Sequence, residues 1–241
     1  MKYNGVDPST LHKALSRSAE IVPGYPALNI ETIETAGGGL LAHVSVAQDT
    51  YTLRMNIAAQ TYEEAMEARL ALAEWAGSSH KQLAELEPTH LPGKAYSAIV
   101  KSISRIEKRF GTVDVTFLIP RPILHSTTES GASSNAKSVN IRTGGSSSAQ
   151  LIISAMLTAE TDELTISADG YSLFVLGGGF AAGQTVEVDM RTGAVLVDGE
   201  HAEERMVYTD MDPDVELLPG LHVIAASAES SIAVRWHDEW L

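Results

Sequence analysis

The 241-residue sequence contains no cysteine, which excludes disulfide frameworks, thiolate zinc sites and thiol nucleophiles. It also lacks any apolar run long enough to span a bilayer. Basic residues are few, 17 against 31 acidic ones, and the net charge of -14 repels nucleic-acid phosphates. Apolar residues still make up 44% of the chain, as in globular proteins. We therefore expect a folded protein that is made in the cytoplasm, does not insert into membranes and shows no sequence-specific nucleic-acid binding.

The charge is distributed unevenly between two parts of the chain. Residues 1–127 hold 12 basic and 13 acidic residues, whereas residues 128–241 hold 5 basic and 18 acidic ones. Between the two parts, residues 125–138 are rich in Ser, Thr and Gly and contain no large apolar side chain, a composition typical of flexible connections. We predict a first domain over residues 1–124, a linker over 125–138 and a second domain over 139–241.

The first domain is predicted to be β-rich. Residues 51–57 alternate between apolar and polar side chains, which is the period of a half-buried strand. Residues 28–35 and 40–46 flank three glycines at 37–39, so a hairpin is expected there. Two more strands are expected over residues 95–106 and 112–119, with a turn near Gly111.

One helix is predicted within this domain. Thr61 and Glu64 fit a capping box, and Gly77 stands where a left-handed C-terminal cap is favoured. Apolar residues recur at helical spacing between them, and Trp75 is expected to pack in the core rather than to stack on a ligand. A basic stretch follows later in the domain, for which a solvated surface is the first interpretation and an acidic partner chain the second: Lys101, Arg105, Lys108 and Arg109.

The second domain is predicted to consist of antiparallel strands only. Short β-favouring runs alternate with turn sequences such as Asp169-Gly170, Asp198-Gly199 and Pro219-Gly220, at the spacing of a β-sandwich or barrel. The expected strands are residues 150–156, 163–168, 172–176, 185–190, 194–197, 205–208, 222–226 and 231–236.

Two patterns in this domain look like ligand sites, and neither has the context that its chemistry requires. The glycines from Gly177 formally fit a dinucleotide fingerprint with Asp198 as the ribose-binding acid, but a strand pattern follows where a helix is needed. The acidic run Asp210, Asp212, Asp214 and Glu216 suggests calcium, yet Val215 occupies the position where an EF-hand requires glycine. We interpret the run as a solvated loop and predict no cofactor and no metal.

No arrangement of residues indicates catalysis. The eight histidines form no zinc-binding pair, and no G-x-S-x-G elbow presents a serine nucleophile. A glycosidase needs two carboxylates at a fixed distance, and that distance depends on the fold and not on the sequence pattern. A glycosidase is therefore the weakest of the hypotheses. Trp236 and Trp240 have rings suited to sugar stacking, but the alternation around Trp236 favours a core position. We predict no catalytic residue, and the sequence assigns no residue to ligand binding.

The order of these elements resembles the distal tail protein (Dit) family of siphophages. The resemblance in the first domain rests on the opening Tyr3 to Asp7, the strand and helix from Leu53 to Trp75, and the closing hairpin from Tyr96 to Pro120. In the second it rests on Val139-Asn140 with Gly144, residues 185–189 and 194–199, and Leu218 to Gly220, which are similar to the family's galectin-like domain. Two residues depart from the family pattern, Gln150 and His222.

The resemblance implies a mainly β fold in which an α+β domain with one helix builds a ring and a galectin-like β-sandwich follows. It implies a structural, non-enzymatic protein of the virion tail tip, also found in prophages. This protein forms a homo-hexameric ring between the tail tube protein and the tail-tip hub or baseplate proteins and leaves a channel for DNA. The alternative is a carbohydrate-binding protein whose C-terminal sandwich recognises host-surface glycans.

Overall fold

The computed structural model describes residues 1–24, 27–35, 38–104, 110–207 and 217–241. The chain divides into two compact units, which we describe separately. Unit 1 comprises Met1–His125 with Leu241, and unit 2 comprises Ser126–Trp240. No helix among the described residues has the length and apolar character needed to cross a membrane.

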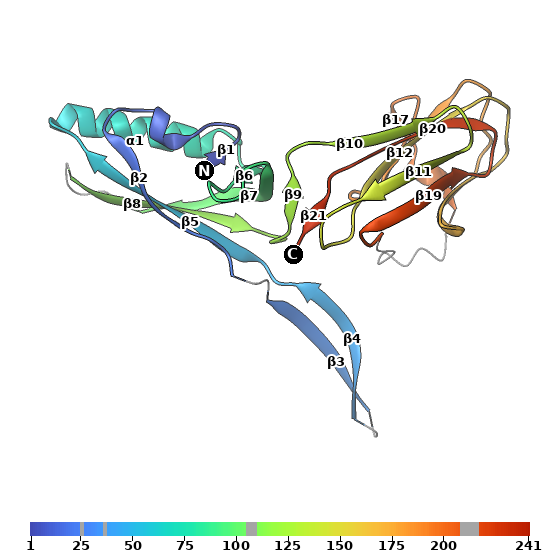
Figure 1. Ribbon diagram of the computed structural model, residues 1–241, viewed down its shortest axis with the longest axis horizontal. Coiled ribbons are helices and arrows are strands. Elements are labelled where there is room, and N and C mark those ends of the chain that lie inside the picture. The colour runs from blue at the N-terminus through green and yellow to red at the C-terminus, as the bar shows by residue number, and fades with distance from the viewer. Residues whose placement is uncertain (25–26, 36–37, 105–109, 208–216) are drawn as a thin grey trace. The chain divides into compact units, whose positions relative to one another are not determined.

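Unit 1 is a twisted antiparallel sheet with one α-helix on one face (Figure 1). The strands of the sheet follow the order β1-β6-β7-β8-β5-β2. The elements of unit 1 are β1 (Lys2–Tyr3), the short 3-10 helix η1 (Pro8–Thr10), β2 (Leu15–Ile21), β3 (Leu28–Thr35), β4 (Gly38–Val46), β5 (Asp49–Ala58), α1 (Tyr62–Gly77), β6 (Ala84–Glu87), β7 (Lys94–Ile103) and β8 (Phe110–Ile119). Strand β9 (Leu124–Ser126) crosses the boundary between the units.

The centre of the sheet is the pairing of β5 with β8, which runs over ten residues from Asp49 opposite Ile119 to Ala58 opposite Phe110. Every second side chain of β5 is buried, from Tyr51 to Ile57, which confirms the alternation predicted for this segment. Because successive strand residues point to opposite faces, this period places one complete face of β5 in the core.

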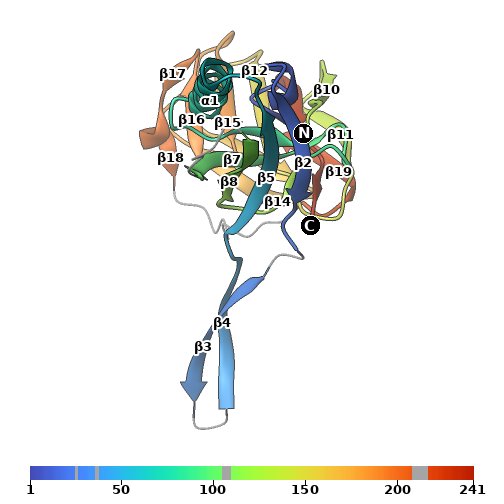
Figure 2. The same ribbon diagram turned by 90° about the vertical axis from the view of Figure 1, so that its left-hand side faces the viewer.

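Strands β3 and β4 pair with each other in a two-stranded sheet of their own. Figures 1 and 2 show the two strands as a ribbon separate from the six-stranded path. The predicted hairpin is therefore confirmed, although the first of its three glycines lies outside the described residues. Gly111 itself lies within β8, opposite Ile57, so the turn expected near it is not at this residue; residues 105–109, which precede β8, lie outside the described residues.

Helix α1 begins where the capping pattern predicts. The Thr61 hydroxyl accepts a hydrogen bond from the Glu64 backbone N–H at 3.1 Å, and the Glu64 carboxylate accepts one from the Gln60 N–H at 2.6 Å. The end of the helix differs from the prediction, because Gly77 is its last helical residue rather than a left-handed cap. The left-handed conformation comes later, at His80 and Lys81, after the Ser78 and His80 amides have closed further turns.

Unit 2 is a sandwich of two antiparallel sheets, as predicted. One sheet has the order β10-β20-β12-β15-β16-β17 and the other β11-β19-β13-β14-β18. The elements of unit 2 are β10 (Ser130–Ser134), β11 (Ser138–Thr143), β12 (Leu151–Leu157), β13 (Leu164–Ala168), β14 (Tyr171–Leu176), β15 (Thr185–Asp189), β16 (Ala194–Val197), β17 (Glu200–His201), the 3-10 helix η2 (Glu203–Arg205), β18 (Met206–Val207), β19 (Gly220–Ala226), β20 (Ser230–Trp236) and the terminal β21 (Glu239–Trp240), which pairs with β9 and belongs to neither sheet.

The segment 125–138 differs from the structureless linker that its composition suggests. Residues Ser130–Ser134 form β10, which pairs with β20 from Ser130 opposite Trp236 to Ser134 opposite Ile232. A strand of small residues is stable here because β20 supplies the hydrogen-bond ladder and the apolar side chains. Composition alone does not distinguish such an edge strand from a flexible connection.

Candidate functional site

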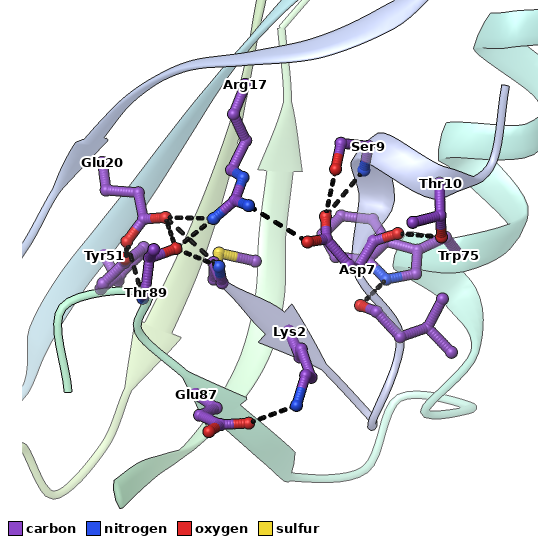
Figure 3. Close-up of polar contacts among 12 residues, drawn as sticks. Lys2, Asp7, Ser9, Thr10, Arg17, Glu20, Tyr51, Trp75, Glu87 and Thr89 are labelled. Carbon is purple, nitrogen blue, oxygen red and sulfur yellow. Dashed lines mark hydrogen bonds and ion pairs between the residues drawn. The ribbon is translucent and has the colours of Figure 1, made fainter. Parts of the chain in front are cut away.

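A polar network in unit 1 fixes the edge strand β2 to the rest of the sheet (Figure 3). Its centre is the Glu20 carboxylate, which accepts hydrogen bonds from the Tyr51 hydroxyl at 2.5 Å and from the Thr89 backbone N–H at 3.1 Å. Arg17 Nη1 lies 3.2 Å from Glu20 Oε1, and the amino group of Met1 lies 3.4 Å from the same oxygen. The network therefore joins β2, β5 and the segment that precedes β7.

The network shifts the pKa values of its members. Burial by itself raises the pKa of Glu20, but the hydrogen bonds from Thr89 and Tyr51 outweigh it and lower the pKa to about 2. Burial and the neighbouring carboxylate raise the pKa of the Tyr51 hydroxyl well above its usual value. Glu20 is therefore charged and Tyr51 protonated near neutral pH, which suits an anchoring role more than a proton-transfer role.

A second contact extends the network to the start of the chain (Figure 3). Asp7 caps η1 by accepting hydrogen bonds from the Ser9 backbone and hydroxyl, and its other oxygen lies 3.2 Å from Arg17 Nη2. Burial raises the pKa of Asp7, but these hydrogen bonds and the guanidinium together lower it. The Trp75 indole N–H donates to the Val6 carbonyl at 3.1 Å, which ties the same segment to α1.

The inner face of α1 forms the core of unit 1. Its buried residues Ala65, Ala68 and Leu72 belong to the same cluster as the β5 side chains. Trp75 is 4% exposed and packs edge-on against the Phe117 ring at 6.0 Å between ring centroids. The prediction that Trp75 is a core residue is therefore confirmed.

The outer side of α1 exposes three large apolar side chains beside its glutamates Glu63, Glu67 and Glu74. Tyr62, Met66 and Leu70 follow one another at intervals of four residues, so they lie on one side of the helix. Tyr62 is 66% exposed and Leu70 is 59% exposed. The signal was present in the sequence, since apolar residues at 65, 68, 72, 75 and 76 already fill one face and leave these three for another.

A groove of about 630 Å³ lies at the C-terminal end of α1. Its apolar lining comes from Ala73 and Ala76 of the helix and from Ile99, Val100 and Ile103 of β7. His80 and Lys81 line it as well, and they are its charged or titratable residues. We call the outer side chains Tyr62, Met66 and Leu70 together with this groove the α1 surface.

A second exposed apolar surface lies where β2 leads into β3. Ile21 is 53% exposed, Val22 is 41% exposed, Leu28 is 53% exposed and Ile30 is 60% exposed. The described residue Glu31 beside them is exposed too. We call Ile21, Val22, Leu28 and Ile30 the β2–β3 surface.

In unit 2 the residues that resemble a dinucleotide fingerprint have structural roles. Gly177 to Gly179 lead into a β-bridge between Phe180 and Thr161, and the element that follows is strand β15 rather than a helix. Asp198 occupies a tight turn and accepts a hydrogen bond from the Thr185 N–H at 2.9 Å. The geometry that a pyrophosphate requires, a helix N-terminus at the glycines, is therefore absent from this described segment.

The remaining candidates fall into the core or outside the described residues. Trp236 is 6% exposed and belongs to the core of the sandwich, as its alternation predicts, so its ring is not a sugar platform. Lys101 is exposed, whereas Arg105, Lys108, Arg109 and the acidic run 210–216 lie outside the described residues. Within the described part of the chain, no three His, Asp or Glu side chains gather in a metal-binding arrangement.

His222, a departure from the family pattern, forms a local clamp in unit 2. Its Nδ1 lies 2.8 Å from Asp169 Oδ2 and its Nε2 lies 2.7 Å from the Leu218 carbonyl oxygen. The contact with His222 and the Val223 N–H lower the pKa of Asp169. These contacts join the turn between β13 and β14 to the start of β19.

Comparison with known proteins gives a consistent result for both units. Residues 144–240 match the family described as the siphovirus-type tail component, C-terminal domain. The chain is similar to the crystal structure of Dit (gp 19.1) of phage SPP1, a paradigm of the hub adsorption apparatus in phages that infect Gram-positive bacteria. That similarity has 12% identity and a TM-score of 0.73, and it covers 99% of this chain and 98% of that one.

A second solved structure supports the same fold. The baseplate of phage P2 in its activated conformation with calcium contains a chain with 9% identity and a TM-score of 0.54, and the similarity covers 93% of this chain and 90% of that one. No curated protein matches the chain. The resemblance stated from the sequence is thus confirmed: residues 144–240 of unit 2 match the siphovirus-type tail component domain, and the chain as a whole has the fold of SPP1 Dit.

Proposed function

We propose that this protein is a structural, non-enzymatic hub of a siphophage or prophage tail. In this role six copies form a ring at the tip of the tail, between the tail tube protein and the tail-tip or baseplate proteins, and leave a channel for DNA. The observation that carries the proposal is the similarity to SPP1 Dit over 99% of the chain, because it includes both units in the same order along the chain. In the proposed hub, one unit builds the ring and the other faces away from it.

The surface of unit 1 supports self-association. A folded chain normally buries its large apolar side chains, and exposed apolar patches of this kind mark interaction sites. Unit 1 exposes two of them, the α1 surface and the β2–β3 surface.

The charge distribution supports a DNA conduit. The second part of the chain, from residue 128 onward, holds 18 acidic and 5 basic residues and therefore repels nucleic acid. The first part is nearly neutral, so a ring built from it would not hold DNA through counterion release. DNA can pass through a channel only if the channel wall binds it weakly.

Light scattering and negative-stain imaging of the purified full-length chain test the proposal. We expect a particle of six times the 25.7 kDa of one chain, with a visible pore and peripheral lobes. Replacing Leu70 of the α1 surface with Asp should shift the mass towards the monomer. The matched control is Tyr171→Asp, because Tyr171 of unit 2 is 75% exposed and lies outside unit 1. A strict monomer at all concentrations, with and without tail proteins from the same phage, would contradict the proposal.

A further inference from the structure

His222 of β19 lies between two hydrogen-bond acceptors that belong to different segments of unit 2. Its Nδ1 lies 2.8 Å from Asp169 Oδ2, in the turn between β13 and β14, and its Nε2 lies 2.7 Å from the Leu218 carbonyl oxygen. Neither partner has a hydrogen to offer, because an ionised carboxylate and a carbonyl only accept. Both ring nitrogens must therefore donate, and an imidazole carries two N–H groups only in its positively charged form.

Asp169 stays ionised over the pH range in which histidines titrate. The hydrogen bond with His222 and the one from the Val223 N–H, at 2.8 Å, lower the pKa of Asp169. Because folding lowers this pKa, the carboxylate is present above its usual pKa of 3.8 and is lost only at more acidic pH. Histidine side chains change charge between about pH 5 and 8. Within that range, the proton on His222 is the part of the contact that changes.

The Leu218 carbonyl belongs to a turn, residues 218–220, that leads into β19. Thr143 at the end of β11 is 3% exposed, and its hydroxyl donates to the Leu218 carbonyl at 3.2 Å. The same hydroxyl oxygen accepts a hydrogen bond from the Gly220 N–H at 3.2 Å. The turn is thus held from two sides, by Thr143 and by His222.

A neutral His222 keeps only one of its two contacts. The remaining N–H faces Asp169, because a carboxylate is a stronger acceptor than a carbonyl. Nε2 then presents a lone pair to the Leu218 carbonyl oxygen, and two acceptors at 2.7 Å do not bind each other. The His222 side chain is 11% exposed, so water has little access to replace the lost hydrogen bond. Thr143 alone then holds the turn.

We propose that His222 is a pH-sensitive switch for the turn of residues 218–220. Charged His222 closes the turn, and neutral His222 releases the Leu218 carbonyl. Leu218 is 59% exposed and Leu221, directly after the turn, is 73% exposed. The switch therefore determines whether these two apolar side chains are held in one fixed position on the surface of unit 2. All of its contacts lie within this unit, so the inference goes beyond the proposed function and does not depend on ring formation.

The other charged or titratable groups around His222 do not replace its proton. Strands β13 and β19 contain no other such residue. The neighbouring described segments supply one each, namely Arg142 of β11, Tyr171 of β14, and Asp238 before β21, which accepts a hydrogen bond from the Gly144 N–H. The side-chain types Arg, Tyr and Asp do not change charge between about pH 5 and 8 in model peptides.

Hydrogen exchange of the full-length chain at pH 5 and pH 8 tests the switch. The protection of residues 218–223 is measured by mass spectrometry and corrected for the intrinsic exchange rate at each pH, and β12 of the same unit serves as the internal reference. We expect this protection to fall about tenfold from pH 5 to pH 8, as for the loss of one hydrogen bond to a charged group. The protection of β12 should change much less.

Replacing Asp169 with Asn should reverse this pH dependence. Asn tolerates the positive φ of the position, and its amide oxygen still accepts from the Val223 N–H. Its NH2 group would donate to Nδ1 of a neutral His222, whose Nε2–H then faces the Leu218 carbonyl. The turn of this variant should be closed at pH 8. It should loosen at pH 5, where a donor on Nδ1 meets the donors of the amide.

Two further variants complete the experiment. His222→Gln should lower the protection of residues 218–223 at both pH values and remove its pH dependence, and this variant decides the question if Asp169→Asn does not fold. The matched control is His201→Gln. His201 also lies beside a carboxylate, with 2.7 Å between its Nδ1 and Glu203 Oε1, but its side chain is 76% exposed and belongs to β17. This variant should behave like the parent chain.

The parent chain and the variants each give a result that can overturn the inference. Equal protection of residues 218–223 at pH 5 and pH 8 in the parent would do so. A pH dependence of the parent's sign and size in Asp169→Asn or His222→Gln would do so too, because it would have to come from other groups. A loss of the pH dependence in His201→Gln would likewise assign the effect to a different histidine.

Discussion

Replacing Glu20 with Gln should destabilise unit 1 in a manner that depends on pH. The substitution keeps the size of the side chain but removes the charge that receives hydrogen bonds from Tyr51 and Thr89 and lies beside Arg17. The folded protein lowers the pKa of Glu20 from 4.5 to about 2. At about 1.4 kcal/mol per pKa unit, that shift corresponds to an upper value of about 3 kcal/mol.

The measured effect should be smaller than this upper value. The Glu20 side chain is 14% exposed, and its partner Arg17 is 30% exposed, so that water screens part of their interaction. We expect Glu20→Gln to lower the free energy of unfolding by about 1 to 2 kcal/mol at pH 7. Because the pKa is lowered on folding, the contribution of Glu20 is present above pH 4.5, declines below that pH and is lost as the pH falls through about 2.

The assay must resolve the two units, since a chain with two units need not unfold in one transition. Equilibrium unfolding in urea, followed by hydrogen-exchange pulse labelling at one fixed pH, reports β5 of unit 1 and β12 of unit 2 separately. Glu74→Gln, which changes an exposed glutamate of the same unit, is the matched control. The parent and Glu20→Gln should differ in the β5 transition at pH 7 and should converge only at a pH below 2, where the Glu20 carboxyl is protonated in the folded protein as well. An equal difference at both pH values would refute the electrostatic explanation.

Three further predictions concern single elements of the fold, each measured as a shift of the unfolding transition under conditions where the chain is monomeric. Leu72→Ala on the buried face of α1 should lower the free energy of unfolding by about 2 to 4 kcal/mol, whereas Leu70→Ala on the outer face should change it by less than about 0.5 kcal/mol. Equal losses would show that the outer face is buried within one chain. Gly145→Ala should lower the free energy of unfolding by more than about 2 kcal/mol, because φ is +92° and the new Cβ would lie 1.9 Å from a backbone oxygen of β21. Gly170→Ala, at φ +87° with no atom within 4 Å of the new Cβ, should lower it by about 1 kcal/mol. Similar values for the two glycines would contradict the steric argument. Thr61→Ala should cost about 1 kcal/mol through the lost N-cap, and Thr61→Ser should recover most of it.

Much of the fold was predictable because its signals are local. The buried period of β5, the capping pair Thr61 and Glu64, and the turns Asp169-Gly170 and Asp198-Gly199 each depend on residues within one element or one turn. Both turn aspartates adopt positive φ, which short polar side chains tolerate better than branched ones. The strands expected in unit 2 follow from the same kind of evidence.

The errors occurred where a partner distant in sequence decides the structure. Strand β10 has the composition of a linker and becomes a strand because β20 pairs with it. Gly77 fits a C-terminal cap, but the chain continues through Ser78 and reverses at His80 and Lys81. The Glu20 network was not foreseen either, because its members come from β2, β5 and the segment before β7 and have no common spacing.

The exposed side chains Tyr62, Met66 and Leu70 on the outer side of α1 were not predicted from the sequence. A single apolar stripe is the normal pattern of a helix that covers a sheet, whereas the apolar residues of α1 fall into two sets. Once Ala68 and Leu72 are known to face the sheet, Met66 and Leu70 cannot do so, because a helix turns by about 100° per residue. Unit 1 covers only the first of these two sets, whereas Tyr62, Met66 and Leu70 stay exposed among the glutamates of the outer side. The two sets separate only after the core has been assigned, because periodicity gives the spacing of apolar residues and not which of them meets the sheet.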